Sequence, residues 1–162
     1  MPDIRAGILQ ESEKPSFDCL RCGHCCQGRG GIVASEKDVR RLCGRLRMTV
    51  EAFAAAYGER RGGKLLIRAG EDGACIFFKK NEGCAVHTVK PDICRAWPYF
   101  RGNLLDRDSL ELCKEFCPGI PPSLPHADFV LQGTALLQRE GLIGTGGADE
   151  AGALQTADLF SC

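Results

Sequence analysis

The chain has 162 residues, 44% of them hydrophobic and 26% charged, which is the size and composition of one soluble domain. Its 21 basic and 21 acidic residues cancel, and no apolar run approaches the ~20 residues of a membrane span. We therefore expect neither a membrane nor a nucleic acid as partner. Residues 1–14 contain no apolar run of signal-peptide length, which predicts a cytoplasmic protein. In a reducing cytoplasm, the 11 cysteines indicate metal or redox chemistry and not disulfides.

Charge is unevenly distributed along the chain. Residues 40–70 contain eight basic and two acidic residues, whereas residues 102–162 contain three basic and nine acidic ones. Solvated helix faces are the commoner cause of such a bias, and an acidic or phosphate-bearing partner is the alternative. The sequence specifies neither a protein partner nor an oligomeric state.

The first half of the chain begins with an irregular lead-in over residues 1–17, followed by the cysteine-bearing loop. Ser35 and Asp38 have the spacing of a capping box, and an apolar stripe from Val39 to Leu46 predicts the helix that it opens. Cys43 lies in that stripe and is interpreted as a small core residue. A second helix is expected from the Thr49 cap to about residue 57.

The second half is predicted to mix short strands and helices. Residues 64–68 indicate a strand, and residues 75–78 and 84–86 indicate the arms of a β-hairpin. Asp108 is expected to cap a short helix carrying Cys113 and Cys117, and a last helix is expected over residues 127–140. Residues 142–162 have few large apolar groups, which predicts a loosely ordered tail in which Cys162 is incidental.

Together these elements predict an α+β fold. It would be a small, mainly helical, metal-organised single domain over residues 18–141, with a short β-hairpin and irregular loops that carry the cysteines.

The densest chemical signal is the octet from Cys19 to Cys26, which holds four cysteines. Two residues between thiolates let both sulfurs reach one metal, and the first three cysteines match the opening of a bacterial ferredoxin cluster motif. Adjacent side chains tend to diverge, so we expect Cys25 and Cys26 to serve different sites or one of them to bridge. The predicted metal ligands are Cys19, Cys22, Cys25, Cys26, Cys75, Cys84, Cys94, Cys113 and Cys117.

The distant cysteines can meet only when the chain folds, so metal binding is expected to be coupled to folding. Thiolates suit both zinc and iron–sulfur clusters. The three-cysteine opening favours a cluster such as [4Fe–4S], and the hairpin cysteines favour zinc. His24 and His87 are the histidines near cysteines, each a ligand candidate or an ordinary surface residue, and His126 is interpreted as the start of a helix.

Four blocks of this sequence resemble the CxxCxxCC family, the YkgJ-like proteins, known as a zinc- or iron-chelating domain. They are the octet ending at Cys26, Cys75-Ile-Phe-Phe, Cys84-Ala-Val-His, and the run from Lys90 to Pro98. Lys90 stands where the family usually has arginine, and His87 where it usually has tyrosine. A similar cluster occurs in flagellin lysine N-methylase with an iron–sulfur cluster, but this chain has no glycine-rich motif for a methyl donor.

Three functions remain open. The chain is first interpreted as a thiolate metal-binding module with a structural, metal-handling or electron-carrying role. Alternatively it is a metal-dependent enzyme or an accessory subunit of a modifying enzyme, with Asp92, Arg95 and Glu82 as the polar candidates, although no catalytic motif is present. A third alternative is an adaptor that presents the aromatic run from Trp97 to Phe100 to a protein partner. In the other two interpretations this run shields the metal site.

Overall fold

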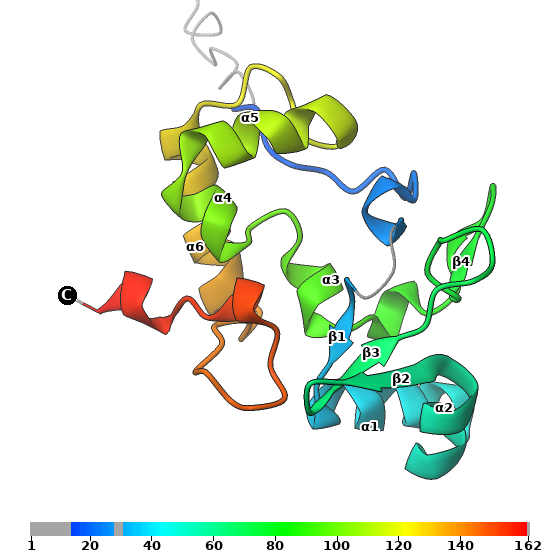
Figure 1. The fold of residues 1–162 in the computed structure, drawn as a ribbon. Helices are drawn as coiled ribbons and strands as arrows, with labels where there is room; N and C mark the ends of the chain where they lie inside the picture. The colour runs from blue at the N-terminus through cyan, green and yellow to red at the C-terminus, as the bar shows by residue number, and fades with distance from the viewer. Residues whose placement is uncertain (1–13, 28–30, 162) are drawn as a thin grey trace, which may run out of the picture.

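The computed structural model describes residues 14–27 and 31–161, so most of the predicted lead-in and Cys162 lie outside the described residues. Six α-helices account for most of the regular structure, as Figure 1 shows. They are α1 (Glu36–Leu46), α2 (Val50–Tyr57), α3 (Asp92–Ala96), α4 (Arg101–Leu105), α5 (Arg107–Phe116) and α6 (His126–Arg139). Short turns of 3-10 helix are η1 (His24–Cys26), η2 (His87–Val89), η3 (Gly152–Leu154) and η4 (Ala157–Phe160).

The strands form two small antiparallel sheets. β1 (Val33–Ala34), β3 (Lys64–Ile67) and β2 (Gly58–Arg61) lie in that order in the first sheet. In the second sheet, β4 (Phe78–Lys79) pairs with β5 (Gly83–Cys84), and Phe78 lies opposite Cys84. The α+β class and the hairpin are therefore as predicted from the sequence.

Local capping explains the helices that the sequence predicted. The Ser35 hydroxyl accepts from the Asp38 N–H while the Asp38 carboxylate accepts from the Ser35 N–H, which completes the capping box of α1. The Thr49 hydroxyl caps α2 by a single bond, in which it accepts from the Ala52 N–H. For α5 the predicted cap is wrong by two residues: the Asp106 carboxylate, and not that of Asp108, accepts the first backbone N–H groups.

Buried side chains form two separate cores. The first joins α1, α2 and the three-stranded sheet around Phe53, Leu42 and Phe77. The second joins α3 to α6 around Phe129, Leu110 and Leu124. Figure 1 shows α1 and α2 on the opposite side of the molecule from α4, α5 and α6, with α3 between the two groups beside β1. Such an arrangement leaves the junction between the cores to be closed by other interactions.

The segment after α6 departs from the loosely ordered tail predicted from its composition. Leu142, Ala151 and Leu154 are buried in the second core, and Gly144 N–H donates to the Leu154 carbonyl at 2.8 Å. This segment needs few apolar residues of its own because η3 packs against α3 and α4, which already contribute buried apolar side chains to the second core. No helix among the described residues is long and apolar enough to cross a bilayer.

Candidate metal centre

The cysteine-bearing segment 14–27 contacts both cores. At one end the Asp18 N–H donates to the Gly119 carbonyl at 3.0 Å, beyond α5. At the other end the Cys26 carbonyl accepts from the Cys75 N–H at 2.7 Å. Ile32, just downstream, packs against both cores. The segment therefore contacts both halves of the molecule, which also meet where α3 lies beside β1 (Figure 1) and where ion pairs join α3 to α1.

Gly23 lets this segment approach the hairpin closely. It adopts φ +81°, in the left-handed region that side chains disfavour, and a Cβ there would overlap the Phe78 ring. The ring of Phe78 thus lies directly against the backbone at Gly23. This contact explains why glycine stands between Cys22 and Cys25, a feature that the spacing of the cysteines alone does not show.

Five thiols from four chain segments lie near one another. Two come from η1, one follows the bridge between Gln27 and Ala74, one lies on β5, and one lies on α3. In nearly every pair of these five thiols, a negative charge on one sulfur raises the pKa of the other. The five are Cys25, Cys26, Cys75, Cys84 and Cys94.

Cys25 and Cys26 both line the same cavity, and the division of this pair between two sites, or a bridging role for one of them, stays a prediction. Because the Cys26 thiol donates toward the Cys25 thiolate, the pKa of Cys25 is lowered to about 6. That interaction, burial and the charges of Cys25, Cys75 and Cys94 together raise the pKa of Cys26. The single 3-10 turn at residues 24–26 therefore presents both sulfurs to the same group of thiols.

Burial is the first cause of the raised pKa values of the remaining three thiols, Cys75, Cys84 and Cys94. Like charges on the neighbouring sulfurs add to it. Thiolates held together in this way repel one another unless a cation lies among them. The arrangement is therefore electrostatically unfavourable by itself and suited to a metal, whose charge offsets the repulsion.

The other predicted ligands divide into two groups. Cys19 and Cys22 are exposed, and together with Cys117 they line the same cavity as the central thiols. Cys113 is buried on α5 outside that lining, and its thiol donates to the Asn103 side-chain carbonyl at 3.4 Å. Cys43 is buried in the first core, as predicted. All of the described cysteines are free of disulfides.

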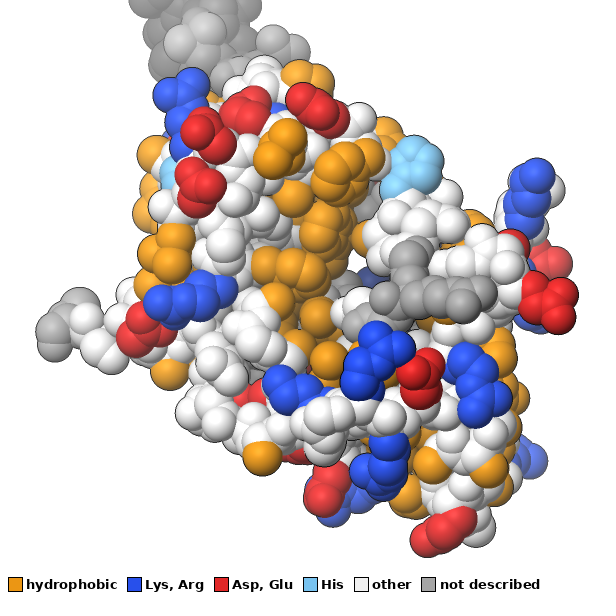
Figure 2. Space-filling model, in the orientation of Figure 1, with side chains coloured by type: hydrophobic (Ala, Val, Ile, Leu, Met, Phe, Trp, Pro, Cys, Tyr) orange, Lys and Arg blue, Asp and Glu red, His pale blue; other side chains and the backbone are white. Residues whose placement is uncertain are grey.

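The cavity between these cysteines has a volume of about 310 Å³. Besides the cysteines, aromatic and aliphatic side chains form much of its wall, including Phe17, Ile32, Phe78, Trp97 and Phe100. Figure 2 shows hydrophobic side chains gathered in a band below α5 on this face. The charged side chains of its described lining are all basic, namely Arg21, Lys90 and Arg95. Soft sulfur donors with an apolar wall and nearby cations fit zinc or an iron–sulfur cluster and not a hard, oxygen-preferring ion.

The thiols surround this space without closing on one point. Within residues 14–27 and 31–161, no three His, Cys, Asp or Glu side chains are grouped as ligands of a single ion. Either the thiols draw together on binding or the bound group is larger than one ion.

The three histidines lie in different surroundings, and of these His87 lines the cavity with the thiols. His24 is exposed, and its Nδ1 lies 2.6 Å from the Phe116 carbonyl, which can only accept, so Nδ1 carries the proton. The contact fastens the cysteine segment to the end of α5. His87 lines the cavity, where burial and the charges of Lys90 and Arg21 lower its pKa and favour the neutral imidazole. His126 begins α6, as predicted.

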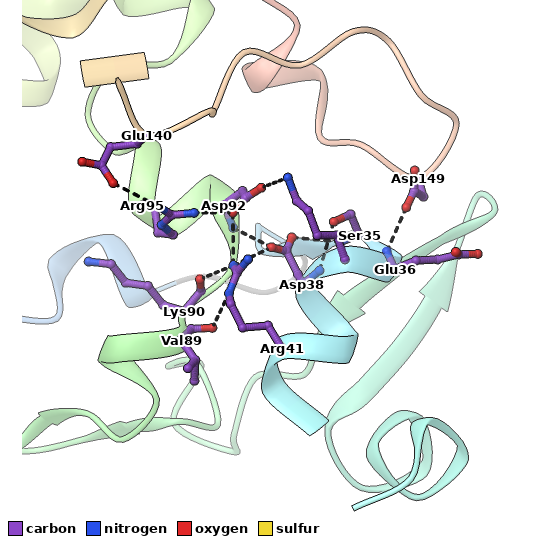
Figure 3. Close-up of polar contacts among 11 residues, drawn as sticks. Ser35, Glu36, Asp38, Arg41, Val89, Lys90, Asp92, Arg95, Glu140 and Asp149 are labelled. Atoms are coloured by element: carbon purple, nitrogen blue, oxygen red, sulfur yellow. Dashed lines mark hydrogen bonds and ion pairs between the residues drawn. The ribbon is translucent and has the colours of Figure 1, made fainter. Parts of the chain in front are cut away.

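The polar candidates for catalysis are engaged in an ion-pair network (Figure 3). The Asp92 carboxylate accepts from Lys37 at 2.8 Å, from Arg95 at 3.0 Å and from Arg41 at 3.1 Å. Arg95 also contacts Glu140 at 3.2 Å. Asp92 is two residues before Cys94, so the network holds α3, and with it this thiol, in place. Glu82 lies apart, exposed and 4.0 Å from Lys79.

Asp38 extends the network into α1. One of its carboxylate oxygens accepts from both Arg41, at 2.8 Å, and the backbone N–H of Asp92, at 3.0 Å. Burial and the neighbouring Asp92 charge raise the pKa of Asp38. For Asp92, burial also acts to raise the pKa. The positive charges of Lys37, Arg95 and Arg41 outweigh burial, so the pKa of Asp92 is lowered. Sequence reasoning identified Asp38 as a helix cap, and nothing in its spacing showed its second role beside Cys94.

The aromatic run contributes to the core and to the wall of the cavity. Tyr99 is buried, with its ring 4.8 Å from that of Phe129 and 6.1 Å from that of Phe17. Trp97 and Phe100 meet edge to face at 5.2 Å and both line the cavity. This geometry corresponds to the shielding role and not to an exposed aromatic patch.

The fold and the site together define a small α+β protein with a thiol-lined, apolar cavity suited to soft metals. The chain belongs to the CxxCxxCC family, described as a "putative zinc- or iron-chelating domain", whose model matches residues 18–118. An uncharacterized protein, MJ0661 of Methanocaldococcus jannaschii, is 29% identical over 109 residues, covering 61% of this chain and 58% of that relative. The chain thus spans less than two thirds of that relative's length. No solved structure matches it.

Proposed function

We propose that this chain holds an iron–sulfur cluster in a reducing, cytoplasmic environment and serves as an electron carrier. The observation that carries the proposal is that four of the five central thiols, Cys25, Cys26, Cys84 and Cys94, line a cavity of about 310 Å³ without a closed set of ligands for one ion among the described residues. Several metal atoms bridged by sulfide extend over more space than one zinc ion does. The central thiols Cys25, Cys26, Cys75, Cys84 and Cys94 would hold the cluster, and when bound it would supply one-electron chemistry.

The surroundings of the thiols support the same proposal. Trp97, Phe100 and Phe78 limit the access of water to the cavity, and exclusion of water tunes the potential of a bound cluster. Cys19 and Cys22 are exposed at the rim, where further ligands or a second metal would be reached from solvent. Asp92 and Arg95, two of the polar candidates for catalysis, are committed to ion pairs, so an electron carrier fits better than an enzyme that uses them as acid or base.

Anaerobic purification followed by quantification of iron, acid-labile sulfide and zinc per chain tests the proposal. The expected result is a coloured protein with near-equal iron and sulfide, whereas a colourless protein with stoichiometric zinc refutes the cluster. Cys26→Ser then separates one site from two. Loss of all metal fits one shared centre, loss of part fits two, and no loss removes Cys26 from the ligands.

A further inference from the structure

Lys90 lies between the thiol cavity and the ion-pair network. It follows η2 and precedes Pro91, and its backbone carbonyl accepts from Arg41 Nη2 at 2.8 Å. This bond fixes the backbone of Lys90 to α1. In Figure 3 its side chain points away from the Arg41 and Asp92 side chains. The side chain is only partly exposed and lines the cavity that holds the cysteines.

The ammonium group of Lys90 has no carboxylate partner within the described part of the chain, where it forms no hydrogen bond and no ion pair. The neighbouring cation Arg95 differs, because it is bound to both Asp92 and Glu140. The charge of Lys90 lowers the pKa of Cys25, Cys84 and Cys94, although other causes outweigh it at the last two. One lysine therefore acts on thiols from three separate chain segments.

A thiolate metal centre needs such a charge. Four thiolates around a divalent ion leave a net negative charge, and a sulfide-bridged cluster with four thiolates is also negative. In a partly buried site that charge is poorly screened by water, so a nearby unneutralised cation lowers the free energy of the bound state. Residues outside the ligand shell that act in this way commonly change metal affinity by about 10- to 100-fold.

We propose that Lys90 is the charge-compensating residue of the thiolate metal centre, strengthening metal binding and raising the reduction potential of a bound cluster. The inference rests on the proposed function, in that it requires thiolates of the cavity to bind a metal. It does not require that metal to be iron. Arginine at this position would supply the same charge, whereas glutamine would keep the length of the side chain and remove the charge.

The test compares Lys90→Gln and Lys90→Arg with Lys64→Gln as a matched control. Lys64 is a partly exposed lysine on β3 that does not line the cavity, so its loss changes the net charge equally. Metal-free protein is titrated with Co²⁺ or Zn²⁺ against a competing chelator, with circular dichroism confirming the fold of each variant. Lys90→Gln should bind the metal about 10-fold more weakly than the wild type does. Lys90→Arg and Lys64→Gln should bind it with nearly the affinity of the wild type.

Reconstitution with iron and sulfide gives a second readout. The midpoint potential should fall in Lys90→Gln relative to Lys64→Gln and should recover in Lys90→Arg. Equal affinity and equal potential in Lys90→Gln and Lys64→Gln overturn the role of Lys90 while leaving the metal site intact. A wild-type chain that binds none of these metals overturns the proposed function itself, so the two failures are distinguishable.

Discussion

Replacing Asp92 by asparagine should destabilise the protein by about 2 kcal/mol, through the ion-pair network that joins α1 to α3. The Asp92 carboxylate binds three cations, of which Lys37 is 64% exposed and contributes little. Arg41 and Arg95 are 27% and 32% exposed. A charge-assisted hydrogen bond contributes about 1.5–3 kcal/mol when buried, and solvent reduces each of these two to about 1–1.5 kcal/mol. Relief of repulsion with Asp38 offsets part of the loss.

The free energy of unfolding, from urea denaturation of the metal-loaded protein, checks this magnitude. Glu140→Gln is the matched control, because it removes an exposed partner of Arg95 at 3.2 Å and should cost less than about 1 kcal/mol. If Asp92→Asn is no less stable than Glu140→Gln, the network does not stabilise the junction between the cores. A cost near 2 kcal/mol is a large part of a typical 5–15 kcal/mol stability.

The same substitution predicts a change in the dependence of stability on pH. The folded pKa of Asp92 is lowered, so its contribution is complete above the unfolded value of roughly 3.9 and is lost as pH falls through the folded value. Asp38 acts with the opposite sign, because its raised pKa stabilises the fold at low pH and this contribution is lost as pH rises. Below about pH 4, wild type and Asp92→Asn should therefore converge in stability. A constant difference down to pH 2 would contradict this assignment.

Four further substitutions test the site and its surroundings. Cys94→Ala should lose most of the bound metal, whereas Cys43→Ala should keep it and lose about 1 kcal/mol of stability, as metal analysis and denaturation would show. Cys113→Ala should also keep wild-type metal content, and loss of metal would place this thiol at the centre despite its contact with the Asn103 side chain. Gly23→Ala should lower the free energy of unfolding by about 2 kcal/mol or more and weaken metal binding, because the left-handed backbone and the Phe78 ring exclude a Cβ. Unchanged stability would refute the contact between Gly23 and the Phe78 ring.

Several elements were predictable because their causes are local. Ser35 and Asp38 lie within one turn of each other, and Thr49 lies directly before the residues whose N–H groups it caps. The hairpin of β4 and β5 likewise depends on a short turn. The octet from Cys19 to Cys26 identifies a soft-metal site by its donor atoms and their spacing alone. The family could be identified from the sequence because the blocks that define it are also local.

Other features required the tertiary structure because their partners are distant in the chain. β2 is a charged edge strand without apolar alternation, and it forms because β3 supplies its hydrogen bonds. The burial of Leu154 depends on a face made by helices far upstream. The separation of Cys113 from the cavity depends on the direction of α5, which no spacing encodes.

The sequence by itself determined which chemistry this protein has, since thiolates at two-residue spacing select soft metals whatever the surrounding fold. Tertiary structure decided which thiols line the same cavity. Cys94 reaches the sulfurs of η1 because Asp38, on α1, binds the backbone of Asp92, on α3, across 54 residues of chain. Tertiary structure also decided that Lys90 lies beside these thiols. These placements come from the packing of two cores against one cysteine-bearing segment, which only the folded chain contains.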